Sequence, residues 1–242
     1  MIYLTQQTYG VKIMEFKPIA FLHNDFPTKF GLPRQSGMAD SLVSRVVMEK
    51  EYQNPEAFRG IEEFEYLWLL AVFEPVGSRG WSPTVRPPKL GGNKRMGVFA
   101  TRSPNRPNPI ALTKVRLLSV ECGCAEGTVL TVSGADLMDG TAILDIKPYL
   151  PFADSVPNAA TGAYGIDKQA LLEVEIPGDI QALFNDGQIA ALKEALAFDP
   201  RPGYKGDDER IFGFCYGGYD IKFKVNNGLL TVVGAEPLKG IE

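Results

Sequence analysis

The residues best suited to chemistry lie in a basic stretch, residues 79–116. This stretch holds nine Lys or Arg residues and no Asp or Glu. The stretch carries a charge of +9 and the whole chain a formal net charge of −4, so the residues outside the stretch sum to −13. Such segregation is typical of a protein that holds an anion on one face. The six prolines and four glycines of the stretch predict loop rather than helix.

Guanidinium groups bind phosphates and carboxylates in pairs of hydrogen bonds, and no acid in the stretch competes for them. The alternative is a solvated basic loop without a ligand. The cations are Arg79, Arg86, Lys89, Lys94, Arg95, Arg102, Arg106, Lys114 and Arg116. We therefore expect an anion-binding loop here.

A second candidate site is the segment GADLMDG, in which Asp136 and Asp139 bracket a turn. Short acids in this arrangement suit hydroxyl or amine groups of a ligand. Asp and Gly are also the ordinary residues of turns, so a purely structural role is the alternative.

Four segments carry a family resemblance. Residues 97–110 (GVFATRSPNRPNPI), 136–155 (DLMDGTAILDIKPYLPFADS), 33–35 (PRQ) and 81–92 (WSPTVRPPKLGG) resemble the TrmO family, and the resemblance extends from about residue 16 to the C-terminus. TrmO proteins are S-adenosylmethionine-dependent tRNA methyltransferases that methylate N6 of the threonylcarbamoyl-adenosine just 3′ of the anticodon. The resemblance implies the same cofactor and substrate here, and a homodimer with sites near the subunit interface.

The resemblance also implies which positions contact the methyl donor. They are Pro33, Arg34, Gln35, Phe73, Glu74, Arg102, Leu112, Asp136, Leu137, Met138 and Asp139. Two positions depart from the family pattern. Glu74 stands where a His is frequent, and Tyr216-Gly217-Gly218-Tyr219-Asp220 replaces a segment with His and Asp.

Methyl transfer to a ureido nitrogen requires loss of its proton, so a positioned base would help. Candidate bases are Asp136, Asp139, Asp145 and Asp154, with Lys147 and Tyr149 as orienting groups. Spacing alone does not choose among them, and Lys147-Pro148-Tyr149 is also compatible with a structural role. We keep Asp136, Asp139, Lys147 and Tyr149 as the catalytic candidates.

Single-stranded RNA is bound by stacking on aromatic rings and by cations that hold its phosphates. Trp81 lies among the cations of the basic stretch and offers a stacking surface, although a Trp is more often simply packed. The RNA-binding candidates are Arg79, Arg86, Lys89, Lys94, Arg95 and Arg106.

Short strands and frequent turns between residues 15 and 160 predict a mainly β domain, a closed antiparallel β-barrel. Expected strands span residues 16–22, 41–48, 64–73, 97–101, 110–120, 128–133 and 141–146, with a helical turn at 55–61 and a turn at 122–127. In the strand at 110–120, Ala111, Thr113, Val115 and Leu117 share one face. No GxGxxG motif follows a strand at the head of a βαβ unit, so a Rossmann-type methyltransferase is disfavoured.

Composition changes after residue 155, and residues 161–242 predict a small α+β domain. Expected there are a strand at 171–176, a helical region capped by Asp179 and broken at Asn185-Asp186-Gly187, and three strands at 211–216, 219–225 and 229–233. Residues 1–14 are expected to be an upstream extension with little regular structure.

Three cysteines and a single His give no metal-ligand set, so we expect no metal. No apolar run approaches the roughly 20 residues of a membrane span, and no secretion signal is evident, which favours a cytoplasmic protein without a membrane partner. Two rivals to a tRNA methyltransferase stay open: a non-catalytic RNA-binding or regulatory protein on the same barrel, and a small-molecule methyltransferase.

Overall fold

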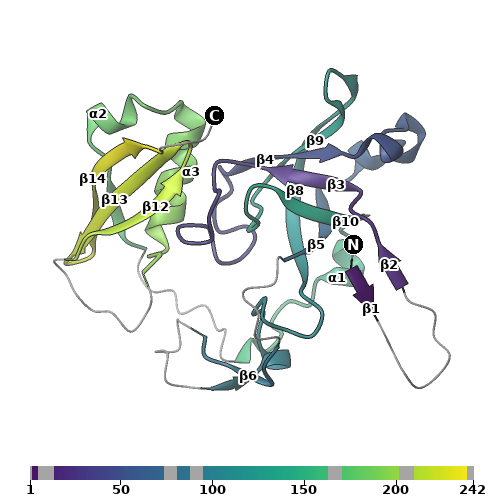
Figure 1. Ribbon diagram of the computed structural model, residues 1–242, viewed down its shortest axis with the longest axis horizontal. Coiled ribbons are helices and arrows are strands. Elements are labelled where there is room, and N and C mark those ends of the chain that lie inside the picture. Colours follow the sequence, from purple (N-terminus) through teal and green to yellow (C-terminus); the bar gives the residue numbers. More distant parts are fainter. Residues whose placement is uncertain are drawn as a thin grey trace.

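The computed structural model describes residues 2–4, 14–73, 81–87, 95–162, 171–201 and 210–238. Among them, six antiparallel strands close a barrel, and a smaller α+β domain lies beside it (Figure 1). Around the barrel the order is β10-β3-β4-β9-β8-β5. The strands are β3 (Ala20–His23), β4 (Val43–Met48), β5 (Tyr66–Val72), β8 (Ile110–Cys124), β9 (Gly127–Ser133) and β10 (Thr141–Pro148). The predicted mainly β, closed antiparallel barrel is confirmed.

Alternation of side chains along each strand fills the barrel interior. Along β5, every second residue from Leu67 to Ala71 is buried, and along β8 Ala111, Thr113 and Val115 point inward. This is the face predicted from the sequence. Because successive residues of a strand point to opposite sides, Ile110, Leu112 and Lys114 lie on the outer surface.

Several predicted element boundaries were wrong. The predicted strand at 97–101 is instead a short strand β7 (Met96–Gly97) followed by a 3₁₀ turn, Val98–Ala100. The predicted strand at 16–22 is divided, with β2 (Met14–Phe16) ending before Pro18, which has no N–H to donate to a ladder. The turn expected at 122–127 is shorter, because β8 bulges and continues to Cys124.

Part of the N-terminal extension has regular structure. Strand β1 (Ile2–Leu4) pairs antiparallel with β2, so the expectation of little structure fails for these residues. Residues 5–13 lie outside the described part of the chain.

The described part of the C-terminal domain is a four-stranded sheet in the order β11-β14-β13-β12, with two helices. Asn185 caps α3 by a reciprocal pair of hydrogen bonds with Gln188, which explains the break that the sequence predicted here. The N-cap of α2 is Pro177 and not Asp179. The elements are β11 (Glu173–Glu175), α2 (Gly178–Gln181), α3 (Asp186–Ala197), β12 (Phe212–Tyr216), β13 (Tyr219–Asn226) and β14 (Leu229–Pro237).

Residues 24–42, which connect β3 to β4, form a bridging segment between the two domains (purple, Figure 1). Its residues Phe26, Ala39 and Leu42 are buried in the same hydrophobic cluster as α3 and β12–β14. At Gly31, with φ of +94°, an added Cβ would overlap the Phe214 ring. The barrel connection therefore supplies part of the core of the C-terminal domain, and the two domains pack as one body along it.

Candidate active site at the barrel mouth

Residues 101–109, which we call the signature loop, lead from the 3₁₀ turn at Val98–Ala100 into β8. The loop is braced by its own polar groups: the Thr101 hydroxyl donates to the Val98 carbonyl at 2.8 Å, and the Arg106 guanidinium donates to the Thr101 carbonyl at 3.3 Å. Arg102 is exposed. One of its guanidinium nitrogens donates to the Gln35 side-chain oxygen at 2.5 Å.

Arg34, the neighbour of Gln35, turns away from the signature loop. Its guanidinium donates to the backbone carbonyls of Asp199, Pro200 and Arg201 at 3.3, 3.1 and 2.8 Å. Burial lowers the pKa of this guanidinium, and the Asp199 charge opposes that effect. The side chain predicted to contact the donor is therefore engaged with the C-terminal domain.

Asp136 lies in the connection between β9 and β10, at one end of the barrel. Burial raises the pKa of its carboxyl group, while the Thr113 hydroxyl and the Arg102 charge oppose the rise. Thr113 is on the inner face of β8, with 1% of its surface exposed. The structure thus brings together Asp136, Arg102 and Gln35, which the sequence predicted as members of one site.

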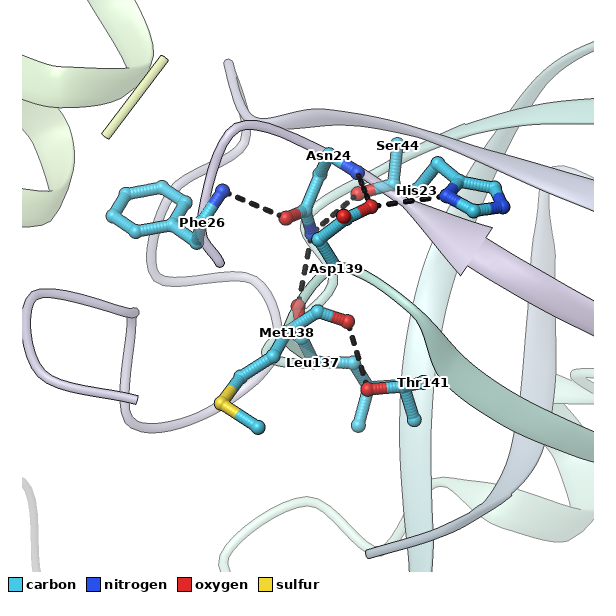
Figure 2. Close-up of polar contacts among 8 residues, drawn as sticks. All are labelled: His23, Asn24, Phe26, Ser44, Leu137, Met138, Asp139 and Thr141. Atoms are coloured by element: carbon cyan, nitrogen blue, oxygen red, sulfur yellow. Dashed lines mark hydrogen bonds and ion pairs between the residues drawn. The ribbon is translucent and has the colours of Figure 1, made fainter. Parts of the chain in front are cut away.

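Asp139 is held at the start of β10 by the end of β3 (Figure 2). Its carboxylate lies 3.0 Å from His23 Nδ1 and accepts from the Asn24 backbone N–H at 3.2 Å. The Asn24 side chain donates to the Leu137 carbonyl at 2.9 Å, and the Thr141 hydroxyl donates to the Met138 carbonyl at 2.7 Å. The acidic turn is therefore fixed on both sides.

Leu137 and Met138 differ in orientation. Leu137 is 1% exposed and belongs to the barrel core, so only its backbone is available to a ligand. Met138 is partly exposed. Residue type alone does not distinguish these two neighbours.

Apolar candidates flank the same loop. The Phe73 N–H donates to the Pro109 carbonyl at 2.8 Å, which ties the end of β5 to the end of the signature loop. Leu112 is 57% exposed on the outer face of β8. Pro33 is next to Arg34 in the bridging segment and is buried. Glu74 lies outside the described residues.

Lys147 and Tyr149 lie at the other end of β10 from Asp139. About 20 Å of strand separates Thr141 from Lys147 at the usual rise per residue. Lys147 forms an ion pair with Asp145 at 2.7 Å. Along β10, Lys147 and Tyr149 therefore lie at the opposite end from Asp139.

Tyr149 belongs to an aromatic group on the outer barrel wall. Its ring is 6.2 Å from that of Tyr66 and 5.6 Å from that of Trp68, measured between centroids. Lys114 Nζ lies 5.0 Å from the Tyr66 centroid and 5.4 Å from that of Tyr149. These contacts fix Tyr149 against β5 and β8. Lys114 and Tyr66 also help to line a neighbouring pocket of about 140 Å³.

The candidate RNA contacts are only partly described. Arg86 and Arg95 are exposed and each lies one residue beyond the paired Val85 and Met96 of β6 (Thr84–Val85) and β7, so the two-stranded sheet brings them together. Arg106 is half-buried against Thr101. Arg79, Lys89 and Lys94 fall outside the described part of the chain.

The sequence did not identify the two residues that hold the acidic turn, namely His23 and Asn24. His23 is the single His of the chain and directly precedes Asn24-Asp25 at the end of a predicted strand. This position was a local signal that His23 has a role, but the sequence did not point to Asp139, which is the partner of His23 and lies 116 positions away.

The described residues were also compared with the requirements of a metal cluster and of a membrane-spanning helix. No group of three or more His, Cys, Asp or Glu residues there is placed to hold a metal ion. No helix in that part of the chain is long and apolar enough to cross a membrane.

The fold is a closed antiparallel barrel, and the signature loop with Arg102 and the partly buried Asp136 lie at its mouth. These features place the protein among the β-barrel proteins that lack a Rossmann fold. Comparison with family models gives the family: the tRNA-methyltransferase O N-terminal domain matches residues 21–155, and the TrmO C-terminal domain matches residues 170–238. The chain belongs to the TrmO family.

The relatives align over 73–92% of this chain and over nearly all of their own length. The tRNA (adenine(37)-N6)-methyltransferase of Escherichia coli K12 is 37% identical over 231 residues, covering 92% of this chain and 98% of that protein. The protein of the same name from Eikenella corrodens is 40% identical over 73% of this chain and 99% of its own. A crystal structure of TrmO from Pseudomonas aeruginosa superposes with a TM-score of 0.73 at 29% identity, covering 92% of this chain and 98% of the other.

Proposed function

We propose that this protein is an S-adenosylmethionine-dependent tRNA methyltransferase that acts on N6 of adenine 37. Relatives that align over most of the chain bear this name, and a Pseudomonas aeruginosa relative, 37% identical, is named as a putative S-adenosylmethionine-dependent methyltransferase. The observation that carries the proposal is the placement of Arg102 and the partly buried Asp136 together at the barrel mouth.

The residues at the mouth fit the cofactor in chemical type. Arg102 is exposed and its donor groups suit a carboxylate, which the methionine moiety supplies. Exposed Leu112 and partly buried Phe73 offer apolar surface for the adenine ring. The exposed Asp139 carboxylate offers an acceptor for ribose hydroxyls. When bound, S-adenosylmethionine supplies an electrophilic methyl group on a sulfonium.

Asp136 is the strongest candidate for the base that receives the N6 proton. Burial raises the pKa of its carboxyl group, which makes the carboxylate a better proton acceptor than an exposed Asp. Asp139 has another role in this scheme, since His23 and Asn24 hold it in place as part of the donor-binding turn.

Two finer features are also proposed. The acceptor is adenine that already carries a threonylcarbamoyl group, because this group adds a carboxylate that the arginines of the basic stretch would bind. The active form is a homodimer, since one chain leaves Phe99 and Phe152 76% and 87% exposed and places Lys147 and Tyr149 at the opposite end of β10 from Asp139. A second subunit would cover apolar surface and complete the site.

The first test is mass spectrometry of tRNA nucleosides from a strain that lacks this protein. We expect loss of the N6-methylated threonylcarbamoyl-adenosine and its return when the gene is restored. Restoration with Asp136→Asn distinguishes enzyme from binder, because a non-catalytic RNA-binding protein would not require the carboxylate. An unchanged nucleoside profile in the deleted strain would contradict the proposed function.

A second test uses purified protein and tRNA with and without the threonylcarbamoyl group. We expect much faster methyl transfer to the modified tRNA. Equal rates would contradict the proposed substrate state and leave the reaction class intact. A molar mass of one chain in light scattering would contradict the dimer.

A further inference from the structure

The C-terminal domain is linked to the barrel mouth by hydrogen bonds of two neighbouring residues, Arg34 and Gln35. The link starts at the turn formed by residues 199–201, whose three carbonyls accept from Arg34. Gln35 then folds back, and its side-chain amide donates to the Arg34 carbonyl at 2.6 Å. The other end of the Gln35 amide, Oε1, accepts from Arg102 at 2.5 Å. Arg102 is thus connected to the C-terminal domain through two side chains.

The turn that receives Arg34 is itself rigidly held. Asp199 has a φ of +48°, a conformation that non-glycine residues seldom adopt. Its carboxylate accepts from the Arg201 guanidinium in a two-pronged pair, with both distances 2.9 Å. The Asp199 N–H donates to the Leu196 carbonyl at the end of α3. The three carbonyls are therefore presented as a fixed cradle.

The bridging segment is anchored to the C-terminal domain on both sides of Arg34. Before it, the Asp25 carboxylate accepts from the Gln188 side chain at 3.0 Å, and Phe26 is fully buried. After it, Ser41 donates from its N–H and its hydroxyl to Glu194 of α3, at 2.8 and 2.7 Å. Both anchors are separate from the hydrogen bonds that lead to Arg102.

From this geometry we propose that Arg34 is a positioning residue, through which the C-terminal domain sets the placement of Arg102 for donor binding. It acts through Gln35 and does not itself touch the donor. Arg34 directs its guanidinium to three carbonyls in a partly buried place, whereas a donor-binding arginine would leave the group free. The role in donor binding rests on the proposed function, whereas the placement of Arg102 does not.

The interactions that join the two domains would therefore serve two different purposes, stability and positioning. The Ser41–Glu194 hydrogen bonds and the buried Phe26 hold the domains together. The Arg34 hydrogen bonds transmit the position of the turn at residues 199–201 to the signature loop. Removing the Ser41–Glu194 hydrogen bonds is expected to lower only the stability of the fold. Removing the Arg34 hydrogen bonds is expected to increase the mobility of the signature loop.

A double-mutant cycle on the full-length protein tests this. Binding of S-adenosylmethionine is measured by calorimetry for the wild type, Arg34→Ala, Arg102→Ala and the double variant. We expect Arg34→Ala to raise the dissociation constant about threefold to tenfold, and the double variant to bind no more weakly than Arg102→Ala, since residues that act through one another are not additive. Independent, multiplying effects would overturn the proposal and indicate direct contact between Arg34 and the donor.

Hydrogen exchange of the free protein gives a second readout that needs no donor. The N–H groups of Ser103, Asn105 and Arg106 bond within the signature loop, to Thr101, Ser103 and Pro104. We expect Arg34→Ala to speed their exchange, and Arg34→Lys, which keeps a cation near the carbonyls, to restore much of the protection. Unchanged exchange in Arg34→Ala would overturn the proposal.

Ser41→Ala is the matched control, because it removes a hydrogen bond between the domains that does not lead to Arg102. It is expected to lower the melting temperature while leaving the exchange of the signature loop and donor affinity at wild-type values. The same loosening of the loop in Ser41→Ala would overturn the specific role of Arg34. If Arg102→Ala binds the donor normally, the proposed donor site fails, and the exchange data alone decide whether Arg34 positions the loop.

Discussion

His23 and Asp139 meet at the end of β3 and the start of β10, with 3.0 Å between Nδ1 and Oδ1, although they are 116 positions apart in the sequence (Figure 2). Both side chains are close to half exposed, so solvent screens their attraction. The pair therefore contributes more to the orientation of the Asp139 carboxylate than to the stability of the fold.

Replacing His23 with Ala tests whether the pair orients the Asp139 carboxylate more than it stabilises the fold. We expect a loss of at most about 1 kcal/mol of unfolding free energy, which is the usual range for exposed pairs. The dissociation constant for S-adenosylmethionine should rise, since among the described residues the carboxylate of Asp139 keeps the Asn24 N–H alone as its partner. Denaturant unfolding and calorimetry on the same preparation measure the two effects, and unaltered affinity would show that His23 does not orient the carboxylate.

Arg102→Ala is expected to weaken donor binding by about 1.5–3 kcal/mol, the usual value for a charge-assisted hydrogen bond. Arg106→Ala is a suitable comparison, because Arg106 donates to the Thr101 carbonyl and braces the loop. Its effect should be smaller. Calorimetric affinities equal to wild type in Arg102→Ala would remove this residue from the donor site.

Asp136→Asn gives a prediction about pH. The folded-state pKa of Asp136 is raised by burial, so the folded protein binds this proton more tightly than the unfolded chain does. The contribution of Asp136 to stability is therefore complete below the unfolded pKa and is lost as pH rises through the folded pKa. In thermal unfolding at neutral pH, Asp136→Asn should melt higher than wild type, and this advantage should shrink as the solution is acidified below the ordinary range of Asp.

The same variant tests catalysis. Removal of a general base lowers rates by about 10²–10⁴-fold, so methyl transfer by Asp136→Asn should fall by that factor while the protein stays folded. Retained turnover would exclude Asp136 as the base and leave Asp139, Asp145 and Asp154 as candidates.

Replacing Lys89, Lys94 and Arg95 with Ala tests the basic stretch as the tRNA surface. If they bind phosphates, tRNA binding should weaken and its log–log dependence on salt should become shallower, by about 0.7 for each single-stranded phosphate that is no longer neutralised. Donor affinity should not change. The matched control replaces Lys17, Lys50 and Lys224, exposed cations outside this stretch, and should leave the slope intact. Parallel salt titrations for wild type and the first triple variant would show that tRNA binds elsewhere.

Gly31→Ala tests the contact between the domains. Its positive φ and the Phe214 ring leave no room for a Cβ, so we expect a loss of several kcal/mol, in the range of core overpacking plus backbone strain. Gly178→Ala is the control: it lies in α2 with no atom within 4 Å of the added Cβ, and should be neutral or slightly stabilising. Thermal unfolding of the two variants makes the comparison, and equal melting temperatures would contradict the tight contact.

Local patterns in the sequence determined the elements of this protein. Alternation along residues 110–117 indicated the inner and outer faces of β8, the Asn-Asp-Gly break indicated the start of α3, and prolines with unopposed cations indicated the signature loop. These features depend on residues close together in the chain, so short-range sterics and hydrophobic periodicity suffice to predict them. The family resemblance extended them to a set of candidate site residues.

Only the tertiary structure decided the direction of each candidate side chain. Arg34 bonds with carbonyls 165 to 167 positions away, Leu137 turns into the barrel, and Lys147 lies about 20 Å of strand from Thr141, at the other end of β10 from Asp139. The divided strand before Ala20 and the 3₁₀ turn at Val98–Ala100 were likewise missed. Such features follow from barrel closure and domain packing, which match residues by shape and hydrogen bonding across the whole chain. The local sequence around each residue does not encode which distant surface it will meet.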